Sequence, residues 1–428
     1  MSTDTIFALS SGSPPAAVAI VRTSGPQAFA AGEVIAGSLP AVRQAALREL
    51  KDPRSGERID QALVLRFAAP ASATGENVVE YQCHGGRAVV NALLDALASL
   101  PGMRAAEPGE FTRRAFANGR IDLTEAEGLA DLLEAETQSQ RRAALLMAEG
   151  GLRRRIDGWR QRLVELSARA EAAIDYVADE EETGTDEAAL AGEAAALAQE
   201  LRGWLNKPRA EALRQGIRVV VAGPPNAGKS SLVNALAESE RAIVTEIAGT
   251  TRDVIEVPLA ISGVPLLLVD TAGLRASGDT VEAIGVARAE GQMQRADILL
   301  WLGEPGDVPD HGRTLLVHAQ ADRPERTPAP AGSLPVSAVT GDGLAALAER
   351  IVEQARRLLP AEGEMALNRR QAAELAEAAA ALEQAQAQDL VRVAEALRLA
   401  RSAFDRLSGR AGVEDMLDAL FGRFCLGK

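Results

Sequence analysis

The residues with the clearest chemical meaning form a short run from Gly223 to Ser230. The run reads Gly-Pro-Pro-Asn-Ala-Gly-Lys-Ser, which matches the pattern of a phosphate-binding loop. A predicted buried strand at 217–222 precedes it, and a predicted helix follows it. The glycines let backbone N–H groups wrap phosphates, Lys229 neutralises phosphate charge, and the Ser230 hydroxyl ligates Mg²⁺. The run therefore predicts nucleotide binding.

Two shorter motifs follow in the order that P-loop GTPases have them. Residues 249–253 read Gly-Thr-Thr-Arg-Asp, and a threonine hydroxyl from such a loop can complete the Mg²⁺ shell. Asp270 ends an apolar run and begins Asp-Thr-Ala-Gly, so its carboxylate suits the same metal shell. The Gly273 N–H can reach a γ-phosphate. Three parts in this order predict a GTPase.

The motif that would read the base is incomplete. GTPases of this kind usually carry Asn-Lys-x-Asp, whereas residues 319–322 read Ala-Gln-Ala-Asp. Asp322 can accept hydrogen bonds from the guanine N1–H and exocyclic amine, but Ala319 loses an amide contact. Gln320 loses the lysine stem that covers the base. Ser337 and Ala338 fit the last base-contacting loop, so we expect guanine preference with weakened affinity or selectivity.

Orientation of the attacking water is a separate question. Many GTPases place a glutamine directly after Asp-x-x-Gly, but that position is Leu274 here, which neither donates nor accepts a hydrogen bond. Glu282, at the start of the next predicted helix, is our candidate for this role. It also ends a run from Asp279 with capping-box-like spacing, so it can serve only as a helix cap. The local sequence leaves both interpretations open.

Alternating strands and helices from Gly216 onward position these motifs, which predicts a parallel α/β domain. A turn at Ser262-Gly263 predicts a hairpin between two of the strands. Only residues 303–313 separate two other strands where a G domain normally has a full helix. The predicted strands are 217–222, 254–261, 264–270, 297–302, 314–318 and 334–337, and the predicted helices are 229–237 and 344–358.

The rest of the chain divides into a mixed N-terminal part and helical segments. Residues 1–118 predict a small α+β domain with strands at 18–21 and 63–67 and a helix at 87–100. Residues 123–178 and 186–212, and those after 360, are rich in Ala, Leu, Glu and Arg and predict helices. An arginine-rich stretch at 153–162 is interpreted as an exposed face paired with carboxylates, in preference to an RNA contact.

Composition narrows the class of protein. Among 428 residues, Lys plus Arg total 46 and Asp plus Glu total 60, a net charge of −14, which excludes a uniformly basic nucleic-acid-coating protein. Two cysteines, Cys83 and Cys425, cannot form a disulfide framework or a Cys-rich zinc site, which favours a reducing cytosol. No signal peptide and no apolar run of about 18 residues is present. We therefore expect a cytoplasmic, multidomain protein without a membrane span.

Motifs along the whole chain together resemble the tRNA-modification GTPase family MnmE, also called TrmE. The resemblance in the G domain and at the C-terminus rests on Asn226, 249–253, 270–275 and the terminal Cys-Leu-Gly-Lys at 425–428. In the N-terminal third it rests on residues 4–6, 20–26, 75–80, 84–86, 108–116 and 118–123.

The resemblance implies a multidomain α/β plus α architecture. Residues 1–118 would be an N-terminal α+β domain that binds folate and dimerises. Residues 119–212 and 362–428 would form one discontinuous all-helical domain. Residues 213–361 would be an inserted P-loop G domain.

The resemblance also implies partners and cofactors. The chain would act with the flavoprotein MnmG (GidA), which carries FAD, on C5 of the wobble uridine of certain tRNAs. The one-carbon unit would come from a tetrahydrofolate derivative, 5,10-methylene-tetrahydrofolate, with 5-formyl-tetrahydrofolate as a related ligand. A homodimer, and a heterotetramer with the partner, are implied.

Site residues follow from the same resemblance. Glu282 and Lys229 would be catalytic, with Glu282 orienting the hydrolytic water. Mg²⁺ would be held by Ser230 and Thr251, and K⁺ by Asn226, Thr245, Ile247 and Thr250. Folate would be held by Arg22, Glu80, Arg120 and Lys428. GTP would be bound by Asn226, Ala227, Gly228, Lys229, Ser230, Ser231, Thr245, Glu246, Ile247, Ala248, Gly249, Thr250, Thr251, Asp270, Thr271, Ala272, Gly273, Asp322, Ser337 and Ala338.

Each folate residue has a plainer interpretation. Arg22 and Arg120 can be surface charges, Glu80 can pair with one of them, and Lys428 is a chain terminus. Two other functions stay open for the whole chain: a ribosome-assembly or RNA-binding GTPase switch, and a scaffold with weakened GTP binding. The altered base motif and the short G domain are compatible with the scaffold. The loop at 11–17 lacks the Gly/Arg-rich run expected beside a folate pocket.

Overall fold

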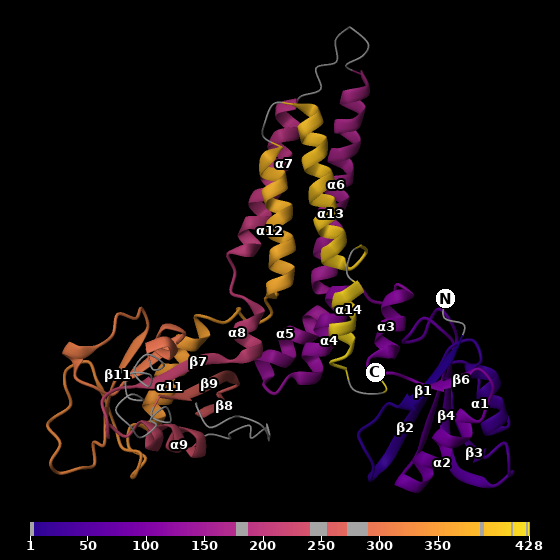
Figure 1. Cartoon of the computed structure of the whole chain (residues 1–428), viewed down its shortest axis with the longest axis horizontal. Helices are drawn as coiled ribbons and strands as arrows, with labels where there is room; N and C mark the ends of the chain where they lie inside the picture. Colours follow the sequence, from indigo (N-terminus) through magenta and orange to yellow (C-terminus); the bar gives the residue numbers. More distant parts are fainter. Residues whose placement is uncertain are drawn as a thin grey trace, which may run out of the picture. The chain divides into compact units, whose positions relative to one another are not determined.

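The computed structural model describes residues 4–176, 187–239, 255–271, 290–385, 389–411, 414–424 and 427 (Figure 1). The chain divides into two compact units. The first comprises residues 1–130, 148–160 and 404–428, and the second comprises 131–147 and 161–403. Both units combine sheet and helix, as the predicted multidomain α/β plus α class requires. The domain boundaries at 118, 212 and 361 stay a prediction.

The first unit contains a mixed sheet in the order β3-β4-β5-β2-β1-β6. Most neighbours are antiparallel, and β6 pairs parallel with β1. Helices α1 and α2 contribute to its core. The predicted strands at 18–21 and 63–67 and the helix from Arg87 are confirmed. The bounds are β1 (Thr5–Leu9), β2 (Ala16–Ser24), α1 (Ala28–Ala36), β3 (Ala45–Lys51), β4 (Arg58–Phe67), β5 (Val78–Gly85), α2 (Arg87–Ala98) and β6 (Met103–Ala105).

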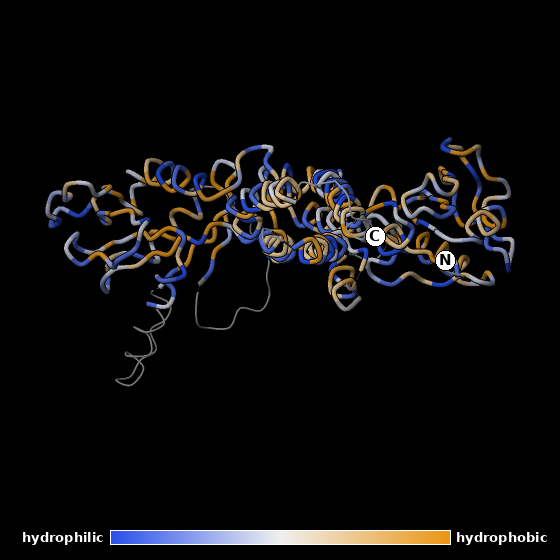
Figure 2. Tube along the Cα trace, turned by 90° about the horizontal axis from the view of Figure 1, so that it is seen from above, coloured by the Kyte–Doolittle hydropathy of each residue, from blue (hydrophilic) through white to orange (hydrophobic). Residues whose placement is uncertain are grey.

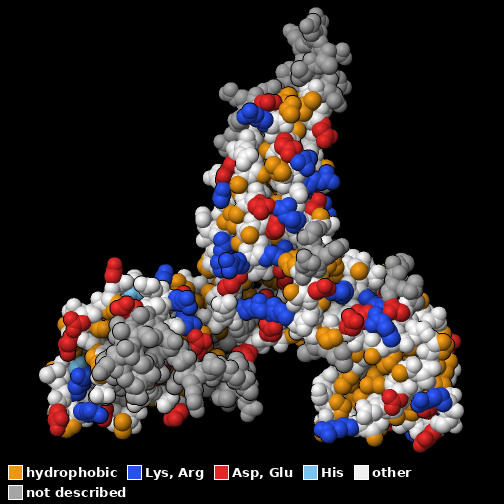
Figure 3. Space-filling view, in the orientation of Figure 1, with side chains coloured by type: hydrophobic (Ala, Val, Ile, Leu, Met, Phe, Trp, Pro, Cys, Tyr) orange, Lys and Arg blue, Asp and Glu red, His pale blue; other side chains and the backbone are white. Residues whose placement is uncertain are grey.

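Alternation along the strands gives this sheet two different faces. Val79, Tyr81 and Cys83 of β5 lie in the core with residues of α1 and α2, whereas Glu80 lies on the opposite face. That opposite face also carries large apolar side chains, including Leu47 and Leu63, which pair across β3 and β4 and are 54% and 42% exposed. Hydrophobic side chains gather over these strands in Figure 3.

Helices complete the first unit. A small core joins Leu123 and Ala126 of α4 to Phe421 and Phe424 near the end of the chain. Asp122 and Glu125 form reciprocal side-chain to backbone hydrogen bonds at the start of α4, the arrangement of a capping box. The bounds are α3 (Glu110–Ala117), α4 (Leu123–Glu134), α6 (Gly151–Tyr176), α13 (Leu390–Ser408) and α14 (Glu414–Phe421), of which α4, α6 and α13 extend into the second unit.

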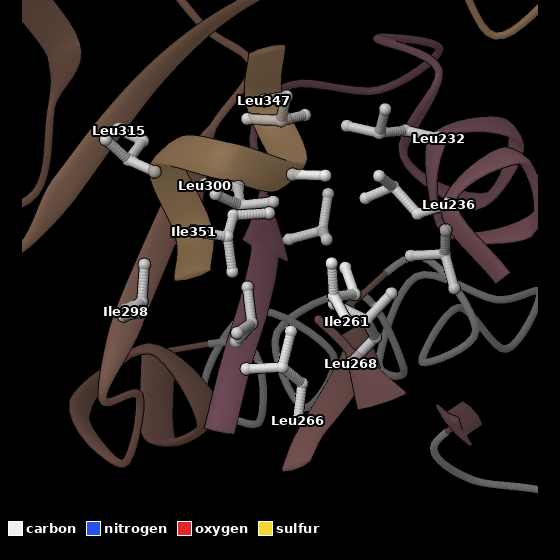
Figure 4. Close-up of a cluster of buried hydrophobic side chains, with 14 of the residues drawn as sticks. Leu232, Leu236, Ile261, Leu266, Leu268, Ile298, Leu300, Leu315, Leu347 and Ile351 are labelled. Carbon is white, nitrogen blue, oxygen red and sulfur yellow. The ribbon is translucent and has the colours of Figure 1, made fainter. Parts of the chain in front are cut away.

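The sheet of the second unit has the order β12-β11-β10-β7-β9-β8, parallel except for the β8–β9 hairpin. Leucine, isoleucine and valine side chains fill its core between the strands and helices α9 and α11 (Figure 4). A single 3-10 turn, Pro305–Asp307, lies in the short segment between β10 and β11. The bounds are β7 (Ile217–Ala222), α9 (Lys229–Ser239), β8 (Ile255–Ile261), β9 (Val264–Asp270), β10 (Ile298–Trp301), β11 (Thr314–Ala319), β12 (Leu334–Val336) and α11 (Leu344–Arg356). These bounds confirm the predicted α/β pattern.

Further helices, short and long, belong to the second unit. Helix α7 packs against α12, and the Arg202–Glu383 ion pair joins them at 2.7 Å. No helix in the described ranges is long and apolar enough to cross a membrane. Figure 2 shows hydrophobic (orange) and hydrophilic (blue) residues interspersed along the trace. The bounds are α5 (Gln138–Ala148), α7 (Glu187–Leu205), α8 (Ala210–Gln215) and α12 (Arg369–Gln384).

The arginine-rich stretch of α6 is paired with carboxylates. Arg153 lies 2.8 Å from Glu125, and Arg160 lies 2.9 Å from Asp405. Arg162 contacts Glu200 in the same way. These three arginines are therefore paired with carboxylates as interpreted, although Arg153 and Arg160 are half-buried, and the preference over an RNA contact stays a prediction.

Candidate functional site

The phosphate loop joins the end of β7 to the start of α9. Lys229 is only 7% exposed, and its Nζ donates to the carbonyl oxygens of Gly223 at 3.0 Å and Pro224 at 2.8 Å. The ammonium group is thus held inside the curve of its own loop. Backbone N–H groups at the start of α9 carry the positive end of the helix dipole. This arrangement suits a phosphate ligand.

Two oxygen ligands meet beside the loop because β7 and β9 are parallel neighbours. Val221 is in register with Asp270, so the carboxyl ends of both strands reach the same edge. The Ser230 hydroxyl donates to the Asp270 carboxylate, which is 1% exposed. Hydroxyl and carboxylate oxygens are the ligands that Mg²⁺ prefers. These two side chains fit a magnesium site.

The base-reading segments lie at the ends of β11 and β12. A hydrogen bond from the Ser337 hydroxyl holds the pKa of Asp322 below its usual range, so this carboxylate is ionised at neutral pH. Ser337 is buried, and its Oγ accepts from the backbone N–H of Val339 at 3.2 Å and Thr340 at 3.0 Å. The loop that contains Ala338 is thereby fixed. The structure thus brings Asp322 and Ser337 together, and their contact with the base stays a prediction.

Gln320 makes a contact that the sequence did not indicate. It has a left-handed backbone, with φ 59°, and its Nε2 donates to the Asn226 carbonyl at 3.1 Å. A Cβ built on Gly228 would lie 3.3 Å from this Nε2, so the side chain also passes beside Gly228. Gln320 therefore reaches the phosphate loop, whereas the expected loss of the stem that covers the base stays a prediction. A cavity of about 580 Å³ beside it is lined by Asn226, Trp301 and His318.

Several predicted site residues lie outside the described residues. These are Thr245, Glu246, Ile247, Ala248, Gly249, Thr250, Thr251, Ala272, Gly273 and Glu282. Of the predicted potassium ligands, Asn226 is described, and it lies on the exposed side of the phosphate loop. Ala227 is buried, Ser231 is exposed in the first turn of α9, and the Thr271 hydroxyl donates to the Val221 carbonyl at 2.8 Å.

The first unit contains a second charged site on the open face of its sheet. Arg22 of β2 is in register with Glu80 of β5, and its Nε donates to Glu80 Oε1 at 2.9 Å. Their side chains are 23% and 16% exposed. The Arg22 guanidinium also lies over the Phe111 ring of α3, 5.7 Å from its centroid. The pair is held in place and remains open to solvent at its edge.

The other two predicted folate residues are Arg120 and Lys428. Arg120 follows α3, is exposed, and packs its aliphatic stem near Gly75. Lys428 lies outside the described residues, but Gly427 before it contacts β1, and its carbonyl accepts from Ser10 Oγ at 2.8 Å. A Cβ on Gly427 would lie 2.0 Å from the Leu9 carbonyl, so only glycine permits this approach. Gly427 of the C-terminal motif therefore lies beside β1, the strand that pairs with β2.

Sequence reasoning missed three contacts at these sites. Phe111 beneath Arg22, Ser10 beneath Gly427, and Gln320 over the phosphate loop were not selected. The left-handed conformation of Gln320 left no local signal, and the first two contacts depend on packing between distant segments. Phe111 does lie within the family-like run 108–116, which was the available signal.

Comparison with known proteins covers the whole chain. A family model described as the MnmE helical domain matches residues 123–425, and one described as the GTP-binding protein TrmE N-terminus matches residues 5–120. The chain is 55% identical over 427 residues to the tRNA modification GTPase MnmE of Erythrobacter litoralis, covering 99% of this chain and 100% of that one. It is 54% identical to the Novosphingobium aromaticivorans protein of the same name, with complete coverage of both.

Two solved structures are similar to parts of the chain. The G domain of the T. maritima FeoB iron transporter matches with 25% identity and a TM-score of 0.24, covering 32% of this chain and 98% of that one. Era in complex with MgGDPNP and a segment of 16S ribosomal RNA matches with 20% identity and a TM-score of 0.26, covering 41% and 69%.

Proposed function

The chain belongs to the MnmE family of tRNA modification GTPases, and on that premise we propose that it is a K⁺-stimulated GTPase that modifies the wobble uridine of certain tRNAs. The observation that supports the GTPase part best is the phosphate loop itself. Lys229 is buried in its curve, and Ser230 and Asp270 meet at its edge. We place this activity in the cytoplasm.

In this proposal each side chain has a defined task. Lys229 exchanges its two carbonyl contacts for β- and γ-phosphate oxygens and stabilises charge that develops in the transition state. Ser230 and Thr251 hold Mg²⁺, which supplies further neutralisation of phosphate charge. Glu282 orients the attacking water, since Leu274 cannot. Asp322, with the Ser337 loop beside it, accepts from the guanine edge.

Potassium would take the place of an arginine finger. Asn226 lies on the exposed side of the phosphate loop, and Thr245, Ile247 and Thr250 would complete the ligand set. A monovalent cation there would add positive charge next to the leaving phosphate. We expect hydrolysis to be faster in K⁺ than in Na⁺ at equal ionic strength, and equal rates would contradict this part of the proposal.

The Arg22–Glu80 pair supports the folate part. A pterin presents donors and acceptors along one edge, which a carboxylate such as Glu80 can read, and a glutamate tail presents carboxylates for Arg22 and Arg120. Lys428 follows Gly427, which approaches β1, the strand that pairs with the β2 strand of Arg22. The 5,10-methylene derivative would supply the one-carbon unit, and 5-formyl-tetrahydrofolate is the stable probe.

The open face of the N-terminal sheet supports a homodimer. Val18, Leu47 and Leu63 are exposed on it, and exposed apolar surface of this kind marks interaction sites. A second copy would cover these side chains. The flavoprotein MnmG, with its FAD, would join the dimer in a heterotetramer and act with it at C5 of the uridine.

The deciding experiment is mass analysis of wobble uridines in tRNA from cells that lack this protein. Loss of a C5 substituent, restored by the wild-type gene, would support the proposal. Unchanged nucleosides would contradict it and would favour the ribosome-assembly switch. GTP turnover by the purified chain separates an enzyme from a scaffold with weakened GTP binding, and copurification with a flavoprotein tests the partner.

A further inference from the structure

Gln320 connects two loops that lie 94 residues apart in the sequence. Its Nε2 donates to the Asn226 carbonyl at 3.1 Å, and a Cβ built on Gly228 would lie 3.3 Å from that Nε2 and 3.5 Å from Cγ of Gln320. Gln320 and Asn226 both have left-handed backbones, with φ 59° and 61°. Non-glycine residues are uncommon in this region, so both loops hold their shape against a local cost.

The phosphate loop needs such a contact because of its own sequence. Pro224 and Pro225 have no backbone N–H, so they cannot donate the hydrogen bonds that usually stiffen a tight loop. Lys229 holds the carbonyls at the start of the loop, those of Gly223 and Pro224. Gln320 holds the carbonyl in its middle. On the other side, the Ala319 carbonyl accepts from Arg326 Nε at 3.1 Å, which anchors the segment that carries the glutamine.

We infer that Gln320 is a positioning residue that fixes the main chain of Asn226 and thereby sets the affinity of the phosphate loop for nucleotide and for K⁺. The inference rests on the proposed GTPase function and on the proposed role of Asn226 in binding the cation. It assigns a task to the residue that replaces the lysine of the usual base-reading motif. Donation of a hydrogen bond, rather than positive charge, is the property that matters.

Three substitutions separate donation from packing and charge. Gln320→Glu keeps the shape but replaces the donor with a negative acceptor that faces the Asn226 carbonyl. Gln320→Lys keeps a donor of similar reach, and Gln320→Ala removes the side chain. Gln384→Glu, on an exposed position near the end of α12, matches the charge change outside the site. All are made in the full-length chain.

The readouts are the Kd for a fluorescent GDP analogue, the K⁺ concentration that gives half-maximal GTP hydrolysis, and the Tm without nucleotide. We expect Gln320→Glu to weaken GDP binding about tenfold and to raise the K⁺ requirement, with Tm unchanged. Gln320→Ala should have a smaller effect of the same sign. Gln320→Lys and Gln384→Glu should stay within about twofold of wild type.

Two results would overturn the inference while leaving the proposed function standing. One is an active wild type with Gln320→Glu unchanged in both Kd and K⁺ requirement. The other is equal impairment of Gln320→Glu and Gln320→Lys, which would show that packing and not donation matters. Absence of nucleotide binding and turnover in the wild type would instead refute the proposed function.

Discussion

The phosphate loop and the Arg22–Glu80 pair assemble charge in different ways. In the loop, Lys229 and the carbonyls that it contacts lie within six residues of one another, so the site is built inside one segment. Arg22 and Glu80 are 58 residues apart and meet because β2 pairs with β5 in a particular register. A slip of one residue would move Glu80 to the core face of the sheet.

This difference determines what can disturb each site. The phosphate loop depends on a few main-chain conformations and one buried ammonium group, so single substitutions within it should act on chemistry and leave the fold intact. The Arg22–Glu80 site depends on the whole N-terminal sheet and on α3 beneath Arg22. Changes in its surroundings should therefore affect ligand binding through the stability of the first unit.

The largest effect is expected for Lys229→Ala. An uncharged methyl group cannot stabilise negative charge on transferring phosphate, so GTP turnover should fall by about 10²–10³-fold or more. Thermal unfolding should show that the second unit is still folded. Lys207→Ala, which removes a surface lysine paired with Glu364 at 2.6 Å, is the matched control and should keep full activity. Equal turnover by Lys229→Ala and wild type would refute the assignment of the phosphate loop.

A smaller effect is expected for Glu80→Ala at the second site. Loss of a carboxylate that reads the pterin edge should weaken binding of 5-formyl-tetrahydrofolate about 10- to 100-fold. Calorimetry with the full-length chain measures this affinity. Glu49→Ala removes an exposed carboxylate from β3 of the same sheet, where it faces Lys51 at 3.3 Å, and should leave binding unchanged. Undiminished binding by Glu80→Ala would remove this residue from the site.

Asp322→Asn tests whether base reading in the G domain rests on one side chain. The carboxylate accepts from guanine N–H groups, whereas an amide matches xanthine better, so the ratio of GTP to XTP turnover should shift about tenfold toward xanthine. Turnover of both nucleotides, measured side by side, gives this ratio. A variant that still prefers GTP to the wild-type extent would show that another group reads the base.

Sequence reasoning was most successful where the determinants are local. The strands 217–222 and 264–270 have the predicted bounds, because continuous apolar runs and turn residues define them. Asp322 beside Ser337 was also expected from two short motifs. The contact of Gln320 with Asn226 was not expected. Its partner lies 94 residues away, and neither this distant contact nor the left-handed backbone of Gln320 leaves a pattern in the local sequence.

The surroundings of Arg22 show the same limit. The resemblance indicated Arg22 and Glu80 together, but no periodicity indicates that Phe111 lies under the guanidinium or that Gly427 touches Leu9. Both contacts depend on how α3 and the end of the chain pack on β1 and β2. Aromatic residues make up only 3% of the chain, and alanine and leucine supply many of the buried side chains of the helices.

The smallest expected effect concerns the acid stability of the first unit. This unit contains the Arg22–Glu80 site, whereas the phosphate loop belongs to the second unit. Glu110 at the start of α3 lies 2.5 Å from Arg104 and 3.0 Å from the buried Arg114. Burial opposes its ionisation, but hydrogen bonds from Arg104, the Glu107 N–H and Arg114 outweigh it and lower the pKa of Glu110 below its usual value of 4.5. A lowered folded-state pKa contributes stability above that usual value, and this contribution is lost as the pH falls through the folded-state pKa.

We therefore expect the free energy of unfolding of the first unit to fall as the pH is lowered below about 4.5, by at most about 1.4 kcal/mol per pH unit for this one carboxyl group. Glu110→Gln should be less stable at neutral pH and should show a shallower dependence on pH, because glutamine does not titrate. Urea unfolding between pH 3.5 and 7, at steps of about 0.5 unit, measures both the stability at neutral pH and its dependence on pH. Pulse proteolysis with mass spectrometry monitors cleavage in α3 and so reports on the first unit. Glu57→Gln, an exposed position before β4, is the control and should keep the wild-type slope. If Glu110→Gln kept that slope as well, acid sensitivity would arise elsewhere, and the Arg22–Glu80 site would not depend on this ion-pair cluster.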